Sequence, residues 1–424
     1  MNILILGSGG RENALAWKIQ KSPLCENLYV APGNVGTAEI AENISVQVND
    51  FEKIGTTCLD KKIDLIIVGP EDPLCNGIVD FFAKNETYNH IKVFGPSANG
   101  AQLEGSKDFS KEFMFRNNIP TAKYRTFTAQ NIDEGLSYID NVEGNIVLKA
   151  DGLAAGKGVI ITDDKEHAKN TFKEMILDEK FGDAGKQVVI EEFLSGIELS
   201  VFVITDGKSY VILPEAKDYK RIGEGDQGLN TGGMGALSPV PFADDAFIQK
   251  IESTIIKPTI DGLNKENIDY RGFIFFGLIK VGEEPFVIEY NVRMGDPETE
   301  VVMLRIEEDL LDIIDATFTN NLADKAISFK KEAASTVMLV AGGYPESYKK
   351  GDTISGLNEV VDVIPFHAGT KLEGENVVTN GGRVIALSAL GKDLKEALSK
   401  SNAAAEIVNW DKRYYRKDIG FDII

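Results

Sequence analysis

The residues with the clearest chemistry are three polar side chains at alternate positions after an apolar run. Glu289, Asn291 and Arg293 follow residues 285–288, and because side chains alternate along a strand the three would share one face. Neighbouring carboxylate and amide oxygens suit a hard cation such as Mg²⁺, and a guanidinium can meet a phosphate bidentately. An edge strand with a polar outer face is the alternative. The turn at 295–298 adds two carboxylates, so the segment indicates a phosphoryl-transfer site.

The elements that would position these residues begin with an alternating N-terminal part. Residues 3–6, 64–68 and 91–94 are apolar runs typical of parallel strands covered on both faces, and each ends in a glycine turn. A doubly wound sheet binds ligands at the carboxyl ends of its strands. A helix is expected near Arg11, and its start would attract anions. Glu12 occupies the third glycine position of the dinucleotide pattern, which disfavours an NAD-dependent oxidoreductase.

Changes in the expected secondary structure divide the chain into three segments. We expect a Rossmann-like, doubly wound α/β domain over residues 1–103 and a central domain of longer helices, hairpins and glycine-rich loops over 104–326. A small α+β domain is expected over 327–424, with an apolar strand at 335–340 and one helix near 394–408. The sequence shows neither an internal repeat nor a low-complexity tract.

A small-residue loop in the central segment has the composition of a phosphate-binding loop. Residues 145–159 predict a strand, a loop and a second strand, with Lys149 and Lys157 supplying positive charge. The loop is not a Walker A motif, because Gly152 lies one residue too close to the lysine and Gly158 replaces the hydroxyl residue. A surface hairpin with two solvated lysines is the alternative.

Two further segments can contact a nucleotide or substrate. The strand at 188–190 leads into Glu191 and Glu192, and with Glu198 it offers acceptors for an adenine amino group and ribose hydroxyls. A common strand and turn would have the same pattern. The glycines of 223–235 cost backbone entropy, which is tolerable where the main chain approaches a ligand, and a disordered surface loop is the alternative.

Composition excludes several classes of protein. The 424 residues are 43% hydrophobic, with no run as long as a membrane span and no basic secretory prefix, so we expect a soluble, cytoplasmic, multidomain protein. The net charge of −21 argues against a general nucleic-acid binder, although local cations can still dominate a pocket. The three cysteines lack metal or disulfide spacing, and the three scattered histidines rule out a histidine-based metal cluster.

Taken in order, these motifs resemble those of the ATP-grasp enzymes and, within them, of the glycinamide ribonucleotide synthetase (phosphoribosylamine–glycine ligase) family. The resemblance spans nearly the whole chain, and the ordered set is far more specific than any single motif. The segments that carry it are 7–12, 31–34, 106–107, 149–159, 191–198, 230–235, 271–273, 289–298, 367–372, 379–384 and 415–420.

The resemblance implies a role for each matching residue. Glu289 and Asn291 would hold Mg²⁺ or Mn²⁺, and Arg293, Asp218 and Lys220 would act in catalysis. The residues implied to bind ATP are Lys107, Lys149, Gly156, Lys157, Gly158, Glu191, Glu192, Phe193, Leu194 and Glu198. Those implied to contact glycine or phosphoribosylamine are Gly9, Gly10, Arg11, Asn34, Asn230, Thr231, Gly232, Gly233, Met234, Asp296 and Glu298. A mobile lid would span about 124–195.

The implied reaction ligates glycine to 5-phosphoribosylamine with cleavage of ATP to ADP and phosphate, through a glycyl phosphate, in de novo purine (IMP) biosynthesis. Positioning and charge neutralisation would drive this reaction. We expect a monomeric, single-activity enzyme without a nucleic-acid or membrane partner. One position departs from the family, because Tyr219 stands where a histidine is usual. Another ATP-grasp carboxylate–amine ligase and a non-catalytic nucleotide sensor are the alternatives.

Overall fold

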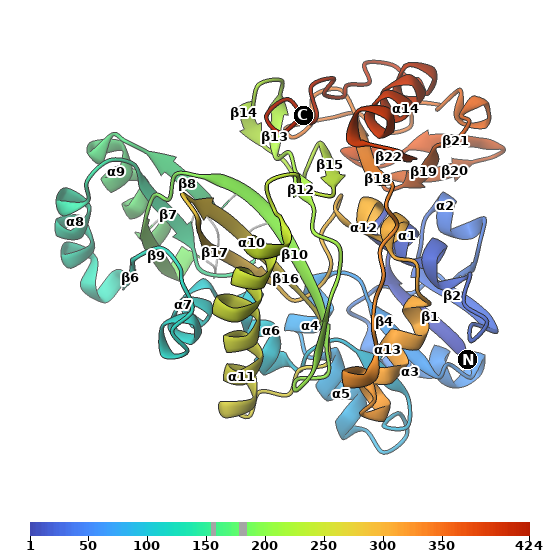
Figure 1. Cartoon of the computed structure of the whole chain (residues 1–424), viewed down its shortest axis with the longest axis horizontal. Coiled ribbons are helices and arrows are strands. Elements are labelled where there is room, and N and C mark those ends of the chain that lie inside the picture. The colour runs from blue at the N-terminus through green and yellow to red at the C-terminus, as the bar shows by residue number, and fades with distance from the viewer. Residues whose placement is uncertain (154–157, 178–184) are drawn as a thin grey trace.

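The computed structural model describes residues 1–153, 158–177 and 185–424, and the following account concerns those residues. Four larger sheets make up the architecture, with helices packed on their faces (Figure 1). Among the described residues, no helix is long and apolar enough to cross a membrane.

The N-terminal part is a parallel five-stranded sheet in the order β3-β2-β1-β4-β5, so the predicted doubly wound domain is confirmed. The apolar runs of β1 and β4 are buried, as expected for strands covered on both faces. The elements of this part are β1 (Asn2–Gly7), α1 (Gly10–Ile19), β2 (Asn27–Pro32), α2 (Val35–Ala38), β3 (Glu42–Asn43), α3 (Phe51–Lys61), β4 (Leu65–Val68), α4 (Glu71–Cys75), α5 (Ile78–Lys84), β5 (Lys92–Phe94) and α6 (Ala98–Gly105).

A small antiparallel sheet follows after α7 (Lys107–Arg116), in the order β6-β9-β7-β8. Two helices pack on it through a core of its own, in which Phe127 lies edge-on to Phe172, and the unit lies at one end of the molecule (Figure 1). Its elements are β6 (Tyr124–Thr128), α8 (Ile132–Asn141), β7 (Ile146–Ala150), β8 (Val159–Thr162), α9 (Lys165–Leu177) and β9 (Gln187–Glu192).

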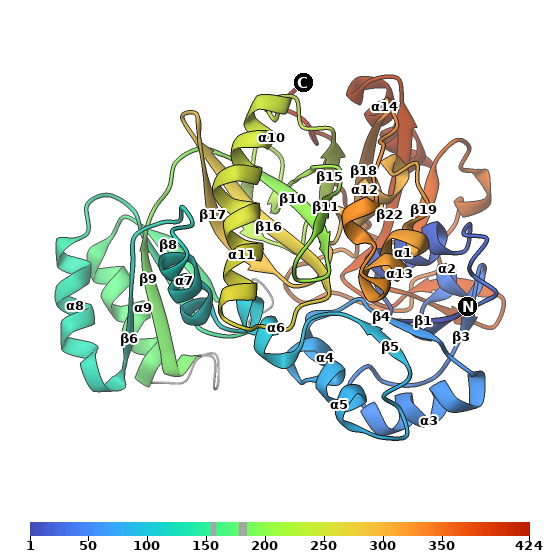
Figure 2. The same cartoon turned by 60° about the horizontal axis from the view of Figure 1, so that its bottom comes forward.

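The second central sheet, β11-β10-β16-β17, is antiparallel and carries the predicted metal-binding strand at its edge. A helical stretch made of α10, a π-helical segment and α11 covers one face (Figure 2), which leaves the other face for the site. Its elements are β10 (Ile197–Thr205), β11 (Tyr210–Ile212), α10 (Asp245–Ile251), the π-helix (Glu252–Ile256), α11 (Lys257–Lys265), β16 (Gly272–Val281) and β17 (Glu284–Asn291).

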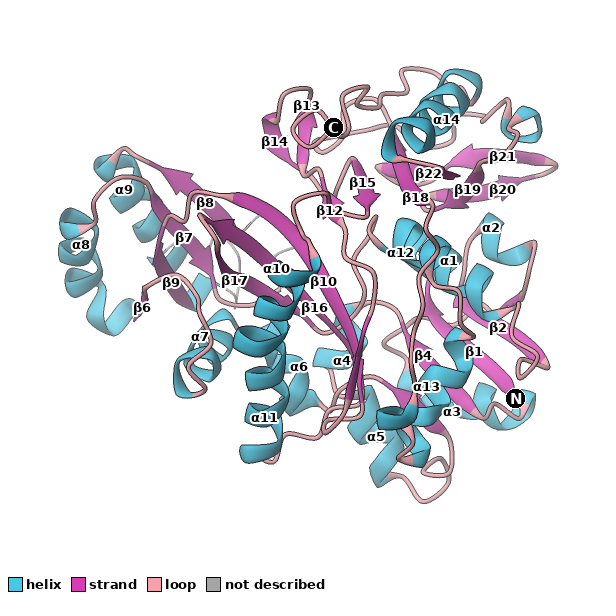
Figure 3. Cartoon of the chain, viewed as in Figure 1, coloured by secondary structure: helices cyan, strands magenta, loops and turns pink. Residues whose placement is uncertain are grey.

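The C-terminal sheet contains strands that were not expected in it. Its order is β12-β15-β18-β22-β19, so two strands from the central segment extend a sheet that otherwise belongs to the last hundred residues (Figure 3). The predicted helix near 394–408 is present as α14. The strands of this sheet are β12 (Lys217–Asp218), β15 (Gly235–Ser238), β18 (Ala333–Val340), β19 (Ile364–His367) and β22 (Arg383–Gly391), and α14 spans Leu394–Ile407. Two separate two-stranded sheets are formed by β13 (Arg221–Gly223) with β14 (Gln227–Asn230) and by β20 (Thr370–Glu373) with β21 (Asn376–Thr379).

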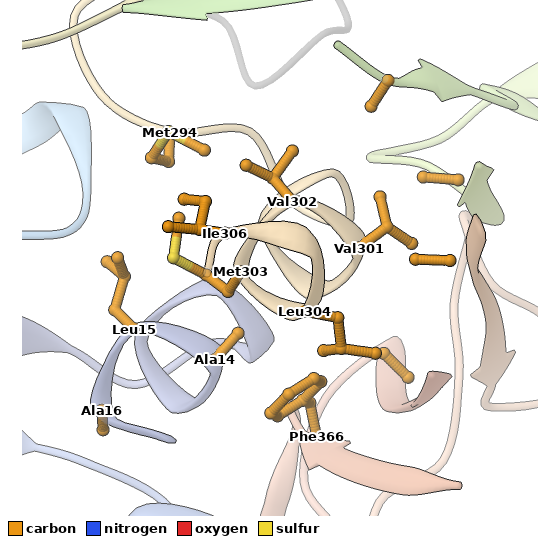
Figure 4. Packing of buried hydrophobic residues seen from close by; sticks show 14 of the residues in the cluster. Ala14, Leu15, Ala16, Met294, Val301, Val302, Met303, Leu304, Ile306 and Phe366 are labelled. Carbon is orange, nitrogen blue, oxygen red and sulfur yellow. The ribbon is translucent and has the colours of Figure 1, made fainter. Parts of the chain in front are cut away.

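A short buried helix joins these parts behind the site. Every residue of α12 (Thr299–Arg305) is buried, and α13 (Leu310–Thr319) follows it. Figure 4 shows Met303 and Leu304 of α12 packed between Leu15 of α1 and Phe366 of β19. The turn that precedes α12 is therefore held by an apolar cluster shared by the N- and C-terminal parts.

Candidate active site

At the end of β17, the side chains on one face of the strand are apolar and those on the other face are polar. Tyr290 is buried in the core, where its hydroxyl lies 2.9 Å from Oγ1 of Thr259. Because neighbouring side chains on a strand point to opposite faces, Glu289 and Asn291 point the other way. Gly277 of β16 pairs with Glu289, and a β-carbon there would lie 3.2 Å from its Cγ, so a glycine gives this carboxylate room. Within the described residues, no hydrogen bond or ion pair engages the Glu289 carboxylate.

Lysines from two other elements lie near this carboxylate. The carboxylates of Asp218, Glu198 and Glu289 outweigh burial and hold the pKa of Lys220 well above its usual range. Burial lowers the pKa of Lys107, and Glu289 opposes that shift. The polar face of β17 thus combines two oxygen donors with cations, which is what a metal-bound triphosphate requires.

Lys149 belongs to a buried charge network beside the same strand. Its Nζ lies 3.0 Å from Oε1 of Glu191 and donates to the Ile288 main-chain oxygen at 3.4 Å. Lys111 holds the other oxygen of Glu191 at 3.2 Å and donates to Oγ1 of Thr121. Burial alone would raise the pKa of Glu191, but the two ammonium groups lower it, so the glutamate is ionised.

The small-residue loop is anchored to the start of α7. Asp151 accepts hydrogen bonds from the main-chain N–H groups of Lys107 and Asp108, and Lys107 Nζ donates to the Gly152 oxygen at 2.9 Å. Gly158 accepts from the main chain of residue 150. Gly156 and Lys157 lie outside the described residues.

The predicted adenine and ribose residues line the junction between the two central sheets. Glu192 accepts from the Lys123 main-chain N–H at 2.9 Å, while Phe193 is exposed and Leu194 is half-buried. Glu198 lies 2.9 Å from Nζ of Lys220. That ion pair places the predicted ribose residue next to the predicted catalytic lysine.

The guanidinium of Arg293 is held by two carboxylates from the N-terminal part. Its Nε lies 3.1 Å from Glu71, and its Nη2 lies 2.7 Å from Glu104. Glu104 also accepts from the Val292 main-chain N–H at 2.7 Å. Burial raises the pKa of Glu104 to about 7 despite the adjacent guanidinium. Arg293 therefore connects the ends of β4 and α6 to the segment that follows β17.

The start of α1 meets the turn after β17. Gly9 donates from its main chain to Glu12 at 2.6 Å, and the Arg11 main-chain N–H lies 3.4 Å from Oδ2 of Asp296. The Arg11 guanidinium is buried, bonded to Glu12 and to the Met294 oxygen. Three of the predicted substrate residues thus lie together, although acidic groups already occupy part of the helix start.

Asn34 links the N-terminal part of the chain to the C-terminal part by hydrogen bonds. Its amide donates to the main-chain oxygens of His367 at 2.6 Å and Ser8 at 2.9 Å, and its oxygen accepts from Thr37. Both polar atoms of the Asn34 side chain therefore form hydrogen bonds within the protein. The residue lies beside the start of α1 without presenting a free group to it.

Alternation of side chains along residues 217–220, which begin with β12, explains the tyrosine that departs from the family pattern. Tyr219 is buried and donates to Asp422 at 2.8 Å, and Lys217 lies 3.3 Å from the same carboxyl group. Asp218 and Lys220 point to the opposite side, toward Glu198. The tyrosine therefore packs against the C-terminal tail, away from the predicted catalytic pair.

Two acids lie near each other where β12 meets the turn before α12. Burial, followed by the charge of Asp218, raises the pKa of Glu298 to about 7. Burial also raises the pKa of Asp218, and Glu298 accepts a hydrogen bond from Ser200 at 3.1 Å. A buried and a half-buried acid that repel each other form a suitable place for an ammonium group.

The loop at 230–234 is held by the C-terminal part. The Gly232 N–H donates to the Tyr344 hydroxyl at 3.0 Å, and Arg383 donates to the Gly232 oxygen at 2.6 Å. The Thr231 hydroxyl donates a hydrogen bond to the main-chain oxygen of Lys220. Met234 is buried in the core, whereas Asn230 is exposed. Gly233 has φ +121°, which favours glycine.

Several residues in the site were not predicted from the sequence: Glu71, Glu104, Lys111 and Arg383. Arg383 lies 2.9 Å from Asp296 and comes from the segment 379–384, which the resemblance had marked without assigning a role. Glu71 follows a strand-end glycine turn, a signal that could have drawn attention to it.

The residues present fit a divalent cation carried by phosphates. In the described part of the chain, no group of three or more His, Cys, Asp and Glu side chains could by itself hold a metal. A carboxylate and an amide with adjacent lysines match a cation whose remaining ligands are phosphate oxygens and waters. Nδ2 of Asn291 is buried without a partner in the described residues, so its amide is available to orient toward a ligand.

Two antiparallel central sheets, with lysines and a carboxylate–amide pair between them, define an ATP-grasp protein. Residues 1–104, 105–299 and 334–422 match the N, ATP-grasp (A) and C domains of phosphoribosylglycinamide synthetase. The chain belongs to the phosphoribosylglycinamide synthetase family.

Individual relatives agree with this assignment. A phosphoribosylamine–glycine ligase of Escherichia coli O6:H1 is 46% identical over 431 residues, which cover 100% of this chain and 99% of that protein. The crystal structure of a phosphoribosylamine–glycine ligase from Thermotoga maritima has a TM-score of 0.85 and 34% identity, covering 99% of this chain and 100% of the other. A biotin carboxylase from Campylobacter jejuni has a TM-score of 0.73 at 16% identity, covering 98% and 93%, and shares the fold.

Proposed function

We propose that the chain ligates glycine to 5-phosphoribosylamine at the expense of ATP, giving N1-(5-phosphoribosyl)glycinamide, ADP and phosphate in de novo purine biosynthesis. The observation that carries the proposal is the polar face of β17, where Glu289 shares the face with Asn291 and lies near Lys107 of α7 and Lys220, which follows β12. No enzyme nucleophile is needed for this chemistry, because phosphoryl transfer depends on position and charge.

The nucleotide would lie between the two central sheets. Lys107 and Lys149 would neutralise its phosphates, together with the loop of Gly156, Lys157 and Gly158. The adenine would lie near Glu191, Glu192, Phe193 and Leu194, and the ribose near Glu198. Glu191 also holds Lys111 and Lys149 in place, since it forms an ion pair with each.

Glu289 and Asn291 would hold Mg²⁺ or Mn²⁺, which supplies charge neutralisation at the transferring phosphoryl group. The protein's own cations complete this task. Arg293 would present its remaining N–H groups to the transferring phosphoryl group, while Glu71 and Glu104 fix its guanidinium. Lys220 would stand on the opposite side, where three carboxylates keep it protonated.

The reaction would proceed in two steps. A glycine carboxylate oxygen attacks the γ-phosphorus, ADP leaves, and glycyl phosphate forms. The amine of phosphoribosylamine then attacks the carbonyl carbon, phosphate leaves, and the amine loses a proton. Asp218 and Glu298 would bind the glycine ammonium, and Asp218 would accept the proton, because its raised pKa suits a base.

The second substrate would lie between the N-terminal part and the loop held by Arg383. The residues proposed to contact the substrates are Gly9, Gly10, Arg11, Asn34, Asn230, Thr231, Gly232, Gly233, Met234, Asp296 and Glu298. Arg11 and Arg383 would offset the carboxylates there. We further propose a monomeric, cytoplasmic enzyme that acts on small molecules alone.

An ADP-release assay tests this function. The protein would be supplied with ATP, Mg²⁺, glycine and phosphoribosylamine generated in the cuvette, with each component omitted in turn. ADP should form only with the complete set. Equal ADP release with D-alanine or with bicarbonate in place of glycine would instead indicate another carboxylate–amine ligase.

A further inference from the structure

One buried acid at the site is not used by the reaction described above. Glu300 lies in the first turn of α12, is 0% exposed, and neither of its oxygens has a hydrogen-bond partner among the described residues. A buried carboxylate without a donor is costly, and most buried polar groups are paired. An isolated acid of this kind avoids much of that cost by keeping its proton.

The surroundings of Glu300 come from three separated parts of the chain. On one side Oε1 presses against Gly10 at the start of α1, where any added β-carbon would collide with it. Ala368, after β19, borders the same space. The glycine therefore allows the carboxyl group of Glu300 to approach the main chain of the helix start.

Among the described residues, the charged groups around Glu300 leave it without a free cation. Asp296 and Glu298 precede it in the same turn, and both disfavour a further negative charge. Arg383, from β22, is the cation that faces it. That guanidinium is already engaged by Asp296 at 2.9 Å and by the main-chain oxygen of Gly232 at 2.6 Å.

We propose that Glu300 is a positioning residue that works as an uncharged carboxylic acid, keeping the start of α1 free of a further negative charge so that a phosphate monoester can bind there. This inference rests on the proposed function, in which the phosphate monoester is that of phosphoribosylamine. A helix start with unpaired main-chain N–H groups attracts anions, and an ionised Glu300 beside it would repel them.

Electrostatics support the geometry. Burial, followed by the charge of Asp296, raises the pKa of Glu300 well above its usual range. Arg383 and the glutamate's own main-chain N–H favour the ionised form, but they do not reverse the shift. Because the raised pKa belongs to the folded state, ionising Glu300 costs stability as pH rises above the usual range of a carboxyl group.

The isosteric substitution Glu300→Gln separates charge from shape. Difference infrared spectra of the full-length protein at neutral pH should show the carbonyl band of a protonated carboxylic acid in wild type, and Glu300→Gln should lose it. The melting temperature of Glu300→Gln relative to wild type should increase as pH rises. Glu283→Gln, in an exposed turn, is the matched control and should change neither measurement.

Binding of ribose 5-phosphate, a stable probe, tests the consequence for the site. Relative to Glu300→Gln, wild type should lose affinity by up to about tenfold per pH unit above the pKa of Glu300. Identical pH profiles for the two proteins, or infrared spectra that share the same acid band, would overturn the proposal. If neither protein binds the probe but the band is lost in Glu300→Gln, the acid is neutral and the assignment of the phosphate site, hence part of the proposed function, is wrong.

Discussion

Nη2 of Arg293 lies 2.7 Å from the carboxylate of Glu104, across 189 residues of sequence. Glu71 holds Nε of the same guanidinium at 3.1 Å. A residue next to the strand proposed to hold the metal is thus oriented by the part of the chain that would bind phosphoribosylamine. The ion pair with Glu104 thus connects the N-terminal part of the chain directly to the segment that follows β17.

Arg293→Lys should lower kcat by about ten- to a hundredfold, or roughly 1.4–2.7 kcal/mol of barrier, because an ammonium cannot reproduce the fork that binds phosphate and Glu104 together. The KM for ATP should change little. Steady-state kinetics measure both. Arg116→Lys, in an exposed pair with Glu266, is the control and should behave as wild type. A change confined to KM would contradict the role of Arg293.

Glu289→Ala should lose most activity and most affinity for Mn²⁺ in the presence of nucleotide, while the protein stays folded. The residue is partly exposed and makes no hydrogen bond or ion pair within the described residues, so its loss leaves no buried group unpaired. Circular dichroism and equilibrium Mn²⁺ binding would report the two effects. Turnover within about threefold of wild type, less than roughly 1 kcal/mol, would show that the metal assignment is wrong.

The KM for glycine should fall as pH rises toward neutrality, by up to about tenfold per pH unit below the pKa of Glu298. The pKa of Glu298 is raised to about 7 by burial and by Asp218, and only its ionised form attracts the glycine ammonium. For the free protein the sign is opposite, since stability is lost as pH rises from the usual carboxyl range to about 7.

Glu298→Gln tests this pH dependence. The variant should show a higher KM for glycine and a nearly flat profile through neutral pH, while its melting temperature at alkaline pH rises. Glu307→Gln, an exposed glutamate outside the site, provides the comparison. A Glu298→Gln profile that follows wild type would remove Glu298 from the glycine site.

Tyr219→Phe should reduce the free energy of unfolding by about 1 kcal/mol, because it removes the hydrogen bond to Asp422. Its kcat should stay near that of wild type, since the side chain points to the C-terminal tail and away from Asp218 and Lys220. Chemical denaturation and steady-state kinetics together test this. A large loss of kcat with unchanged stability would place the tyrosine in the reaction.

The arrangement of side chains at the end of β17 was predictable because it depends on local rules. Alternation along one strand puts Glu289 and Asn291 on the polar face, and Tyr290 in the core confirms that spacing. Alternation along residues 217–220 likewise separates Tyr219 from its neighbours, although the expectation from the sequence did not use it. Strand ends followed by glycine turns also indicated the parallel N-terminal sheet.

Other features depend on pairings between distant segments, which periodicity does not encode. The strand pairing of β15 with β18 joins residues about a hundred positions apart, so β12 and β15 were not expected in the C-terminal sheet. The carboxylates that hold Arg293 and the arginine that holds Asp296 also come from distant parts of the sequence. Such contacts are set by tertiary packing, and only the structure reveals them.

Oxygen-isotope transfer tests the central claim most directly, namely that a phosphoryl group from ATP activates the glycine carboxylate. The protein would be given glycine labelled with ¹⁸O in its carboxylate, and the released inorganic phosphate would be analysed by mass spectrometry or ³¹P NMR. The account predicts one labelled oxygen in each phosphate formed. Phosphate without label, with product still appearing, would contradict it.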